Sequence, residues 1–241
     1  MQTLFGFDSL PLIKHAVATV GSYDGVHIGH KVLIEQVIRR AKLRGGESVV
    51  LTFEPHPRIT LGQDEGLKLL TTAEEKGQIL ESLGVDYMLI IPFDRAFSRL
   101  THEQFISEYL IDKLHIEELV VGYNHHFGHN KGGDYNFLTT QGLEVTRIDQ
   151  QLVENNKVSS TIIRSTIERG DMYTANQLLG HTYLIIGTSD NNGFVATDSY
   201  KLLPPLGSYR AVIDGAEGEI SVVEGGLYCS VGNKLITIEI W

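Results

Sequence analysis

The sequence predicts an α/β protein in which a parallel-sheet domain is followed by a small β-rich module. Short apolar segments alternate with amphipathic stretches of helical length through most of the chain, and this alternation is typical of a parallel sheet with helices on both faces and right-handed crossovers. From Gly180 onward the pattern changes to short, glycine-spaced β-rich segments, typical of a small antiparallel barrel or sheet. We therefore expect two domains, residues 1–181 and 182–241.

The individual elements follow from local signals. The apolar, β-branched run at residues 16–20 ends at a glycine and precedes a helix that starts near Gly29. Capping-box pairs, Thr72 with Glu75 and Thr101 with Gln104, predict the starts of two further helices. Later helices are expected at 134–141, from 157 to the glycine at 170, and at 171–179. The other expected strands cover residues 48–53, 85–91, 119–122, 143–148, 183–186, 207–213 and 235–240, and residues 54–58, with two prolines, are expected to form a stiff loop.

Composition restricts the class of protein. The 241 residues are 42% apolar, which is ordinary for a globular chain with a sizeable core. The single cysteine, Cys229, excludes an intramolecular disulfide and a cysteine-based zinc site. A net charge of −10 argues against a nucleic-acid partner. Because no leader-like or membrane-spanning run is visible, we expect a cytoplasmic protein without a membrane partner.

The stretch at residues 21–30 has the features of a phosphate-handling loop. It follows a predicted strand and opens a helix, whose N-terminus stabilises an anion through free backbone N–H groups. His27 and His30 are three residues apart, and Gly29 between them has no Cβ to block a phosphate. Two imidazoles could donate hydrogen bonds to charge developing at phosphorus. The alternative is that they are surface histidines near a helix start.

Three loops with unusual residues each follow a predicted strand: residues 21–30, 54–58 and 122–128. Ligands of parallel sheets bind beyond the carboxyl ends of the strands, so these loops are expected to converge on one rim. A fourth segment, 157–164, places three hydroxyls and Arg164 at a helix start. These hydroxyls either cap the helix or hold a polyphosphate together with the guanidinium, and the segment alone leaves both open.

Four ordered motifs resemble the N-terminal adenylyltransferase domain of the prokaryotic bifunctional riboflavin kinase/FAD synthetase family, within the Rossmann-like nucleotidyltransferase superfamily marked by HxGH. The resemblance covers roughly residues 10–181. Residues 21–30 resemble G-x-F-D-G-x-H-x-G-H with Tyr23 for phenylalanine, 53–57 resemble F-x-P-H-P, 122–128 resemble G-x-[DN]-F-x-F-G with His125 for the usual phenylalanine, and 158–164 resemble I-S-S-T-x-[IV]-R.

The resemblance implies that the FMN phosphate attacks the α-phosphorus of ATP, which gives FAD and pyrophosphate, with Mg²⁺ held by the ATP phosphates and no assigned protein ligand. It implies that His27, His30 and Arg164 are the catalytic residues. The implied ATP-binding residues are Gly21, Ser22, Tyr23, Asp24, His27, Gly29, His30, Gly122, Ser159, Ser160, Thr161 and Arg164. The implied FMN-binding residues are Phe53, Glu54, Pro55, His56, Pro57, Arg58, Asn124 and Phe127, with Gly128 beside the flavin. An alternative for His125, His126 and His129 is a metal cluster, which is disfavoured because adjacent residues of an extended segment point opposite ways.

The second module departs from the family. Residues 203–209 resemble its L-P-x-x-G-x-Y, and the module occupies the place of the riboflavin kinase barrel. The kinase motif G-F-P-T-A-N, however, is replaced by Gly-Phe-Val-Ala-Thr-Asp at residues 193–198, so the threonine and asparagine that would hold magnesium-ATP are out of register. We expect a truncated module of about sixty residues without kinase activity, retained for structure or for self-association; the oligomeric state is open.

Three other functions are compatible with parts of the pattern. A bifunctional enzyme would also phosphorylate riboflavin, and a related enzyme would adenylylate another small phosphate. A flavin-binding regulator would have lost catalysis, although the intact His27, His30 and Arg164 argue against it.

Overall fold

The chain forms two units, each assembled from segments that are distant in sequence. The computed structural model describes residues 1–123, 135–140, 142–149, 152–153, 156–232 and 234–241. The first unit comprises Met1–Tyr23, His30–Glu65 and Ile79–Gln151, and the second comprises Asp24–Gly29, Gly66–Gln78 and Leu152–Trp241. The domain boundary expected at residue 181 stays a prediction.

The first unit contains the expected parallel sheet. Its six strands are ordered β1-β4-β3-β2-β5-β6, and every neighbouring pair is parallel. The sequence analysis did not anticipate β1, which pairs with β4 at one edge of the sheet. The strands are β1 (Gln2–Phe5), β2 (Ala16–Val20), β3 (Ser48–Glu54), β4 (Tyr87–Pro92), β5 (Ile116–Gly122) and β6 (Glu144–Ile148).

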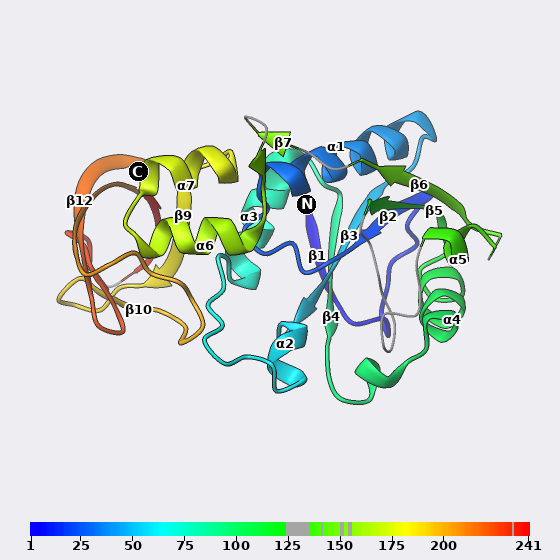
Figure 1. The fold of residues 1–241 in the computed structure, drawn as a ribbon, viewed down its shortest axis with the longest axis horizontal. Coiled ribbons are helices and arrows are strands. Elements are labelled where there is room, and N and C mark those ends of the chain that lie inside the picture. Colours follow the sequence, from blue (N-terminus) through cyan, green and yellow to red (C-terminus); the bar gives the residue numbers. More distant parts are fainter. Residues whose placement is uncertain (124–134, 141, 150–151, 154–155, 233) are drawn as a thin grey trace. The chain divides into compact units, whose positions relative to one another are not determined.

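Helices cover both faces of this sheet, and alternate strand residues serve the two sides (Figure 1). Val17 and Val120 pack with Val37 and Ala41 of α1 (Ile28–Leu43). The opposite side is the larger core, where Ala18 and its neighbours in the sheet meet apolar side chains of η2 and α5. The remaining helices are α2 (Pro57–Thr60), α3 (Ala73–Leu83), η1 (Phe97–Arg99), α4 (His102–Gln104), η2 (Phe105–Ile111) and α5 (Tyr135–Thr139).

The two predicted capping boxes are present. Thr72 and Glu75 exchange hydrogen bonds of 2.8 and 3.2 Å at the start of α3, and Thr101 and Gln104 do the same before α4. After α4 the chain continues as the π-helix η2 rather than as the regular α-helix that the apolar stripe indicated. Asp112 N–H donates to the carbonyl of Ser107, five residues back. The expected cap Asp134 lies outside the described residues.

The second unit contains a six-stranded antiparallel sheet ordered β10-β13-β12-β11-β14-β9. A bridge between Ser189 and Val195 joins its two ends, so the sheet is nearly closed, as the small-barrel prediction required. Its strands are β9 (Tyr183–Thr188), β10 (Phe194–Ala196), β11 (Gly207–Ile213), β12 (Ala216–Val223), β13 (Gly226–Tyr228) and β14 (Leu235–Ile240); a separate pair is β7 (Leu152–Val153) with β8 (Asn156–Lys157).

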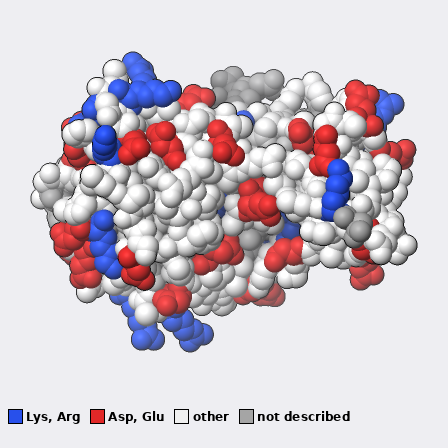
Figure 2. Space-filling model, turned by 180° about the vertical axis from the view of Figure 1, so that it is seen from behind, with Lys and Arg blue, Asp and Glu red and all other residues white. Residues whose placement is uncertain are grey.

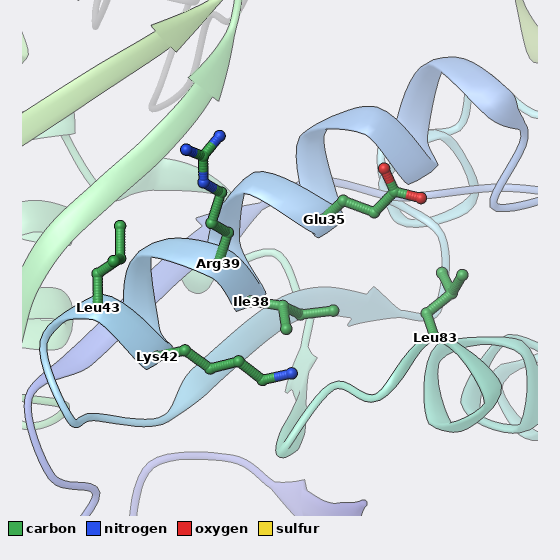
Figure 3. Close-up of a pocket in the computed structure, with 6 residues that line it drawn as sticks. All are labelled: Glu35, Ile38, Arg39, Lys42, Leu43 and Leu83. Atoms are coloured by element: carbon green, nitrogen blue, oxygen red, sulfur yellow. The ribbon is translucent and has the colours of Figure 1, made fainter.

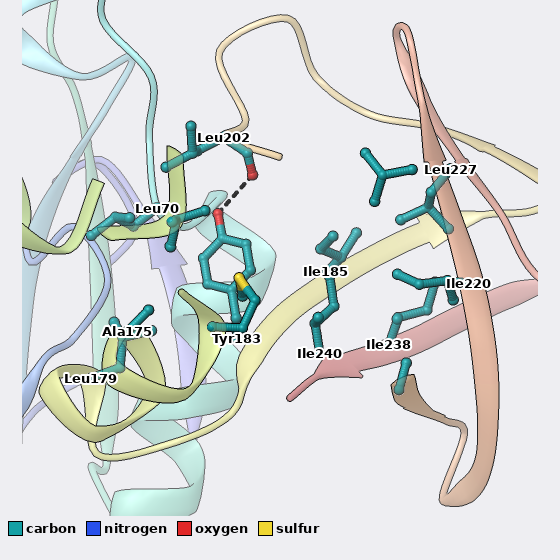
Figure 4. Close-up of a cluster of buried hydrophobic side chains, with 14 of the residues drawn as sticks. Leu70, Ala175, Leu179, Tyr183, Ile185, Leu202, Ile220, Leu227, Ile238 and Ile240 are labelled. Atoms are coloured by element: carbon teal, nitrogen blue, oxygen red, sulfur yellow. Dashed lines mark hydrogen bonds between the residues drawn. The ribbon is translucent and has the colours of Figure 1, made fainter. Parts of the chain in front are cut away.

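Two helices, α6 (Ser160–Glu168) and α7 (Met172–Leu179), pack against this barrel. Their buried residues share one hydrophobic core with the strands, in which Tyr183 and Leu179 lie beside Leu70 (Figure 4). The left-handed residue Gly180 ends α7, as glycine does where an L side chain would be strained.

Two surface properties complete the description. No helix in the described part of the chain combines the length and apolar character needed to cross a membrane. On the face shown in Figure 2, acidic and basic side chains are scattered among each other.

Candidate functional site

The order of the parallel strands identifies the edge of the sheet where a ligand is expected. From β2 the chain proceeds to β3 and β4 on one side, and then returns to β5 and β6 on the other. In such sheets the crevice for a ligand lies at the carboxyl ends of the strands where this reversal occurs. Gly21 directly follows β2 and Gly122 ends β5, so two of the predicted loops begin at the switch point.

Tyr23 explains the glycine that follows β2. Its ring is buried, and a Cβ on Gly21 would lie 3.0 Å from it. The Tyr23 hydroxyl lies 2.6 Å from Oγ1 of Thr19, which itself donates to the carbonyl of Val120. Burial raises the pKa of Tyr23 well above its ordinary value. The same ring meets the imidazole of His30 edge-on, with 5.2 Å between centroids, so Tyr23 helps to orient His30 in the first turn of α1.

The backbone of the loop is unusual at three positions. Tyr23 and Val26 adopt positive φ values of 46° and 38°, which non-glycine residues rarely do, and Gly25 has a φ of 83°. A Cβ on Gly25 would also lie 2.7 Å from a methyl group of Leu70. Such conformations persist where surrounding contacts impose them, and they concentrate at functional sites.

Asp24 is the centre of a hydrogen-bonded group in the second unit. Its Oδ1 accepts the backbone N–H groups of Leu70 and Thr71 at 2.8 and 3.1 Å, and its Oδ2 pairs with Nη2 of Arg164 at 2.5 Å. The carboxylate is almost completely buried, so these partners replace water. Nε of Arg164 is buried and has no hydrogen-bond partner among the described residues. The loop is held further by a hydrogen bond from Gly25 N–H to Thr71 Oγ1, at 3.0 Å.

The three hydroxyls before Arg164 have different surroundings. Ser159 is the N-cap of α6, and its Oγ accepts the N–H of Ile162. Ser160 Oγ donates to the backbone carbonyl of Asp24 at 2.9 Å, and Thr161 is exposed. The helix-capping interpretation is therefore confirmed for Ser159. Ser160 and Arg164 are instead bonded to Asp24. The polyphosphate role of the segment stays a prediction.

His27 lies one residue before α1 and is 6% exposed. Burial lowers its pKa to about 4, with a smaller opposing effect from Asp24 and a further lowering by His181. The imidazole is therefore neutral near pH 7 and has one N–H to donate. Gly29 is favoured here for a reason besides phosphate access, because a Cβ would lie 3.2 Å from the His27 ring, which would have to shift.

The predicted FMN loop follows β3, and part of it is helical. Pro57 and Arg58 belong to α2, so the expectation of a stiff loop through residue 58 is wrong at these positions. His56 is the N-cap, and Pro57 is tolerated in the first turn because the N–H it lacks would have no helical partner. Phe53 packs against Phe93 and Phe97, with ring centroids 5.3 and 6.3 Å apart, and thereby holds the end of β3.

The remaining predicted residues lie in the loops after β2, β3 and β5. Ser22 accepts a hydrogen bond from Thr52 through its carbonyl, at 3.2 Å. Glu54 and Pro55 are exposed and are joined by a cis peptide bond. Asn124, Phe127 and Gly128 lie outside the described residues, as do His125, His126 and His129 of the alternative metal cluster. Among the residues that are described, no three His, Cys, Asp or Glu side chains are grouped to hold a metal ion.

Sequence reasoning missed three residues that contact Asp24 or Gly25 in the second unit. Leu70 and Thr71 contact Asp24 and Gly25, and His181 Nε2 lies 3.0 Å from the carbonyl of Gly25. The capping box that begins at Thr72 marked the helix start next to this segment, but no local signal connects residues 70–71 with a loop more than forty positions away.

A surface pocket of about 380 Å³ lies elsewhere in the first unit (Figure 3). Its lining contains none of the predicted site residues. The lining residues are Glu35, Ile38, Arg39, Lys42, Leu43 and Leu83.

Comparison with known proteins places this chain in a family. Residues 11–162 match the family described as FAD synthetase. A bifunctional riboflavin kinase/FMN adenylyltransferase of Listeria monocytogenes is 36% identical over 208 residues, which are 80% of this chain and 66% of the relative. The corresponding protein of Escherichia coli is 34% identical over 71% of this chain and 56% of its own length. This chain thus spans less than two thirds of the length of these two bifunctional relatives.

A relative of similar length supports this assignment, and a solved structure shares the fold. A Listeria monocytogenes protein named FAD synthetase is 33% identical over 82% of this chain and 81% of its own length. A Streptococcus pneumoniae structure, titled a macrolide-efflux protein, superposes with a TM-score of 0.84 over 99% of this chain and 97% of the other, at 21% identity, and shows that the fold is shared. The match over residues 11–162 and the similarity to these relatives show that the chain belongs to the FAD synthetase family.

Proposed function

We propose that this chain is an FMN adenylyltransferase, which makes FAD from FMN and ATP. An oxygen of the FMN phosphate forms a bond to the α-phosphorus of ATP, the bond from that phosphorus to the bridging oxygen of the β-phosphate breaks, and pyrophosphate leaves with the bonding electrons. The protein needs no covalent intermediate for this reaction. Its contribution is to position the substrates and to stabilise charge that develops during the transfer.

The observation that carries the proposal is the group around Asp24. Two residues assigned to the leaving phosphates, Ser160 and Arg164, meet the loop residue Asp24, although they are separated from it by 136 and 140 positions. A planar guanidinium is suited to phosphate oxygens, and a buried carboxylate that also accepts two backbone N–H groups fixes its orientation. Nε of Arg164, which has no hydrogen-bond partner among the described residues, is a further donor that such a ligand could satisfy.

The two histidines of the loop would act on the α-phosphoryl group. His27, neutral near pH 7, would donate one N–H to a phosphoryl oxygen, and His30, oriented by Tyr23, would donate another. Such donors are effective when they are held in place before the reaction, because the site then needs no reorganisation as charge develops.

Mg²⁺ fits this site as a partner of the ATP phosphates rather than of the protein. The buried Asp24 carboxylate is already engaged by Arg164 and two backbone N–H groups, and the described residues offer no grouped set of ligating side chains. When bound, the ion would neutralise charge on the phosphates. The residues of the chain would then hold the phosphate oxygens that the ion leaves free.

For the acceptor, we propose FMN at the loop after β3. Phe53 is anchored by its aromatic neighbours, and His56 and Arg58 offer polar groups at the start of α2. Asn124 and Phe127 belong to the same proposal on the basis of the motif alone. The proposal is of an enzyme that acts on small molecules in the cytoplasm and has no nucleic-acid partner. Any self-association is assigned to the C-terminal module.

Incubation of the protein with FMN, ATP and Mg²⁺, followed by chromatography of the flavins and assay of pyrophosphate, tests the proposal. FAD and pyrophosphate in equal amounts are expected. Tight FMN binding without FAD would instead indicate a flavin-binding regulator. The same reaction with pantetheine phosphate or nicotinate mononucleotide in place of FMN tests whether another acceptor is preferred.

We further propose that the module lacks riboflavin kinase activity. In the run at residues 193–198, the residues of β10 pair with β13, and a Cβ on Gly193 would lie 2.2 Å from the carbonyl oxygen of Cys229. The substituted motif supports the proposal. Phosphorylation of riboflavin at a rate comparable to FMN adenylylation would overturn it and would favour the bifunctional alternative.

A further inference from the structure

Lys201 is a buried cation in the barrel module with every donor engaged. Its side chain is 1% exposed. The ammonium donates to the carbonyl of Leu70 at 2.8 Å, to the carbonyl of Leu184 at 2.7 Å and to Oε2 of Glu75 at 2.6 Å. An ammonium has three N–H groups, so these partners use all of them.

Glu75 completes the buried pair and connects it to two elements. Its Oε2 accepts the N–H of Thr72 in the capping box of α3, at 2.8 Å, and its Oε1 accepts the N–H of Ile186 in β9, at 3.1 Å. The Glu75 side chain is also 1% exposed. A buried ion pair whose remaining hydrogen-bonding positions are filled has little freedom to rearrange.

Aromatic packing encloses the same ammonium. The Tyr183 ring centroid lies 4.4 Å from Nζ of Lys201, within the range of a cation–π contact. The Tyr183 hydroxyl donates to the carbonyl of Leu202 at 2.7 Å, drawn as the dashed line in Figure 4. Burial lowers the pKa of Lys201, and the neighbouring Glu75 carboxylate opposes this effect.

The peptide units of Leu70 connect this pair to the candidate phosphate site. The Leu70 carbonyl accepts from Lys201, whereas the Leu70 N–H donates to Oδ1 of Asp24. The preceding residue is fixed as well, because Leu69 N–H donates to the Tyr200 carbonyl at 2.6 Å and the Leu69 carbonyl accepts from Leu202 N–H at 2.9 Å. The segment that orients Asp24 is thus attached on its other side to residues 200–202.

We propose that Lys201 is a positioning residue for adenylyl transfer. By holding the Leu70 carbonyl, it fixes the backbone that orients Asp24 and, through Asp24, the guanidinium of Arg164. Residues 200–202 of the barrel module therefore serve the transferase site, whether or not the module phosphorylates riboflavin. The expected effect of Lys201 on the reaction rate rests on the proposed function of that site. Its expected effect on the loop backbone rests on the hydrogen bonds alone.

The first test compares Lys201→Met with a control of matched stability. Methionine keeps the length and apolar stem of the side chain but removes its charge and donors. We expect kcat/KM for ATP to fall about tenfold or more, with KM for FMN changed less than about twofold. Ile238→Ala, in the same core but on the other side of Tyr183 from Leu70 in Figure 4, is the control for general loosening. Equal losses in the two variants, at matched unfolding temperature, would overturn the proposal.

A double-mutant cycle with Arg164→Ala separates positioning from a merely structural role. If Lys201 acts through Asp24 and Arg164, then Lys201→Met should cost less than about twofold in an Arg164→Ala background, because the group it positions is absent. Additive losses in the double variant would show that Lys201 acts independently of Arg164, and they would contradict the proposal.

Hydrogen exchange provides a readout that does not depend on activity. In Lys201→Met, amides of peptides that contain Leu70 and Thr71 should exchange about tenfold faster than in the wild type. In Ile238→Ala, the exchange rate of these peptides relative to the rest of the module should stay unchanged. If Lys201→Met does not fold, Lys201→Met combined with Glu75→Gln removes both charges and is measured instead. Faster exchange in a protein that makes no FAD would refute the proposed function but keep the connection; unchanged exchange would refute the connection.

Discussion

Nη2 of Arg164 lies 2.5 Å from Oδ2 of Asp24, and this ion pair joins the loop after β2 to the first turns of α6. The other oxygen of Asp24 is occupied by two backbone N–H groups, so the carboxylate cannot turn away from the guanidinium. Its effect is to present the arginine in one orientation. The charge and the geometry of Arg164 can therefore be tested separately.

Replacement of Arg164 by lysine keeps the charge but loses the planar donor fork. Because a lysine ammonium cannot make the same paired contacts to Asp24 and to phosphate oxygens, kcat/KM for ATP should fall by about two orders of magnitude. Steady-state kinetics of FAD formation measure this. Arg169→Lys, at the C-cap of α6, is the matched control, since Arg169 donates to the hydroxyls of Ser165 and Thr166 in that helix and should keep near-normal rates. Similar rates in both variants would remove Arg164 from the site.

His30→Ala should lower turnover by about two or more orders of magnitude, as loss of a preorganised donor does, while FMN affinity stays nearly unchanged. Turnover and an FMN titration measured on the same preparation check both parts. His115→Asn is a suitable control, because His115 is exposed and its φ of 52° suits asparagine. A His30→Ala enzyme with normal turnover would show that the loop at residues 21–30 is not the catalytic centre.

His27 should make the folded protein sensitive to acid. Its pKa is about 4 in the folded state against an ordinary 6.5, so below pH 6.5 the unfolded chain binds a proton that the folded chain does not. The free energy of unfolding should therefore fall as the pH drops from 6.5 towards 4, by about 2.5 kcal/mol at pH 4.5 from this residue. Above about pH 7.5, where neither the folded nor the unfolded chain binds this proton, the residue contributes no slope.

Urea unfolding of the wild type and of His27→Gln, at pH 7 and pH 4.5, isolates this contribution. The stability of the variant relative to the wild type should rise by that amount at the lower pH, because glutamine does not titrate. A stability difference that is the same at both pH values would mean that His27 titrates normally in the folded protein.

The three hydroxyls at the start of α6 should differ in their effect on stability. Ser159→Ala removes the N-cap and should cost about 0.5–1 kcal/mol. Ser160→Ala breaks the hydrogen bond to the Asp24 carbonyl and should cost about 1 kcal/mol. Thr161→Ser, at an exposed position, should stay within about 0.5 kcal/mol of the wild type. Thermal or urea unfolding ranks the three, and a Thr161 effect as large as that of Ser160 would contradict the described contacts.

Local sequence signals were sufficient for much of the fold. The apolar run that ends at Gly21 predicted β2, and the capping box of Thr72 with Glu75 predicted the start of α3, because such patterns act within a few residues. The same reasoning failed at Pro57, where two prolines suggested a loop. A proline in the first helical turn is compatible with a helix, so the short α2 was one of two possible interpretations.

The contacts that organise the candidate site are less visible in the sequence. Asp24 was named as an ATP-binding residue, yet its partners Leu70, Thr71 and Arg164 lie 46 to 140 positions away. Backbone donors carry no residue-type signature, so no motif could indicate that Leu70 and Thr71 serve Asp24. The π-helix η2 was hidden for a related reason, since an apolar stripe does not distinguish hydrogen bonds to the fourth residue from bonds to the fifth.

The two oxygens of Glu75 have a consequence for how this protein can evolve. One accepts a hydrogen bond at the start of α3 and the other accepts one from β9, so a change at Glu75 would affect both elements at once. A domain transplant that replaces the barrel without supplying a lysine at position 201 would leave a buried anion without its cation. In the run at residues 193–198, the carbonyl of Asp198 accepts the backbone N–H of Lys201 at 2.9 Å. Because a backbone carbonyl makes this contact, the departure of the run from the kinase motif is compatible with retention of the buried pair.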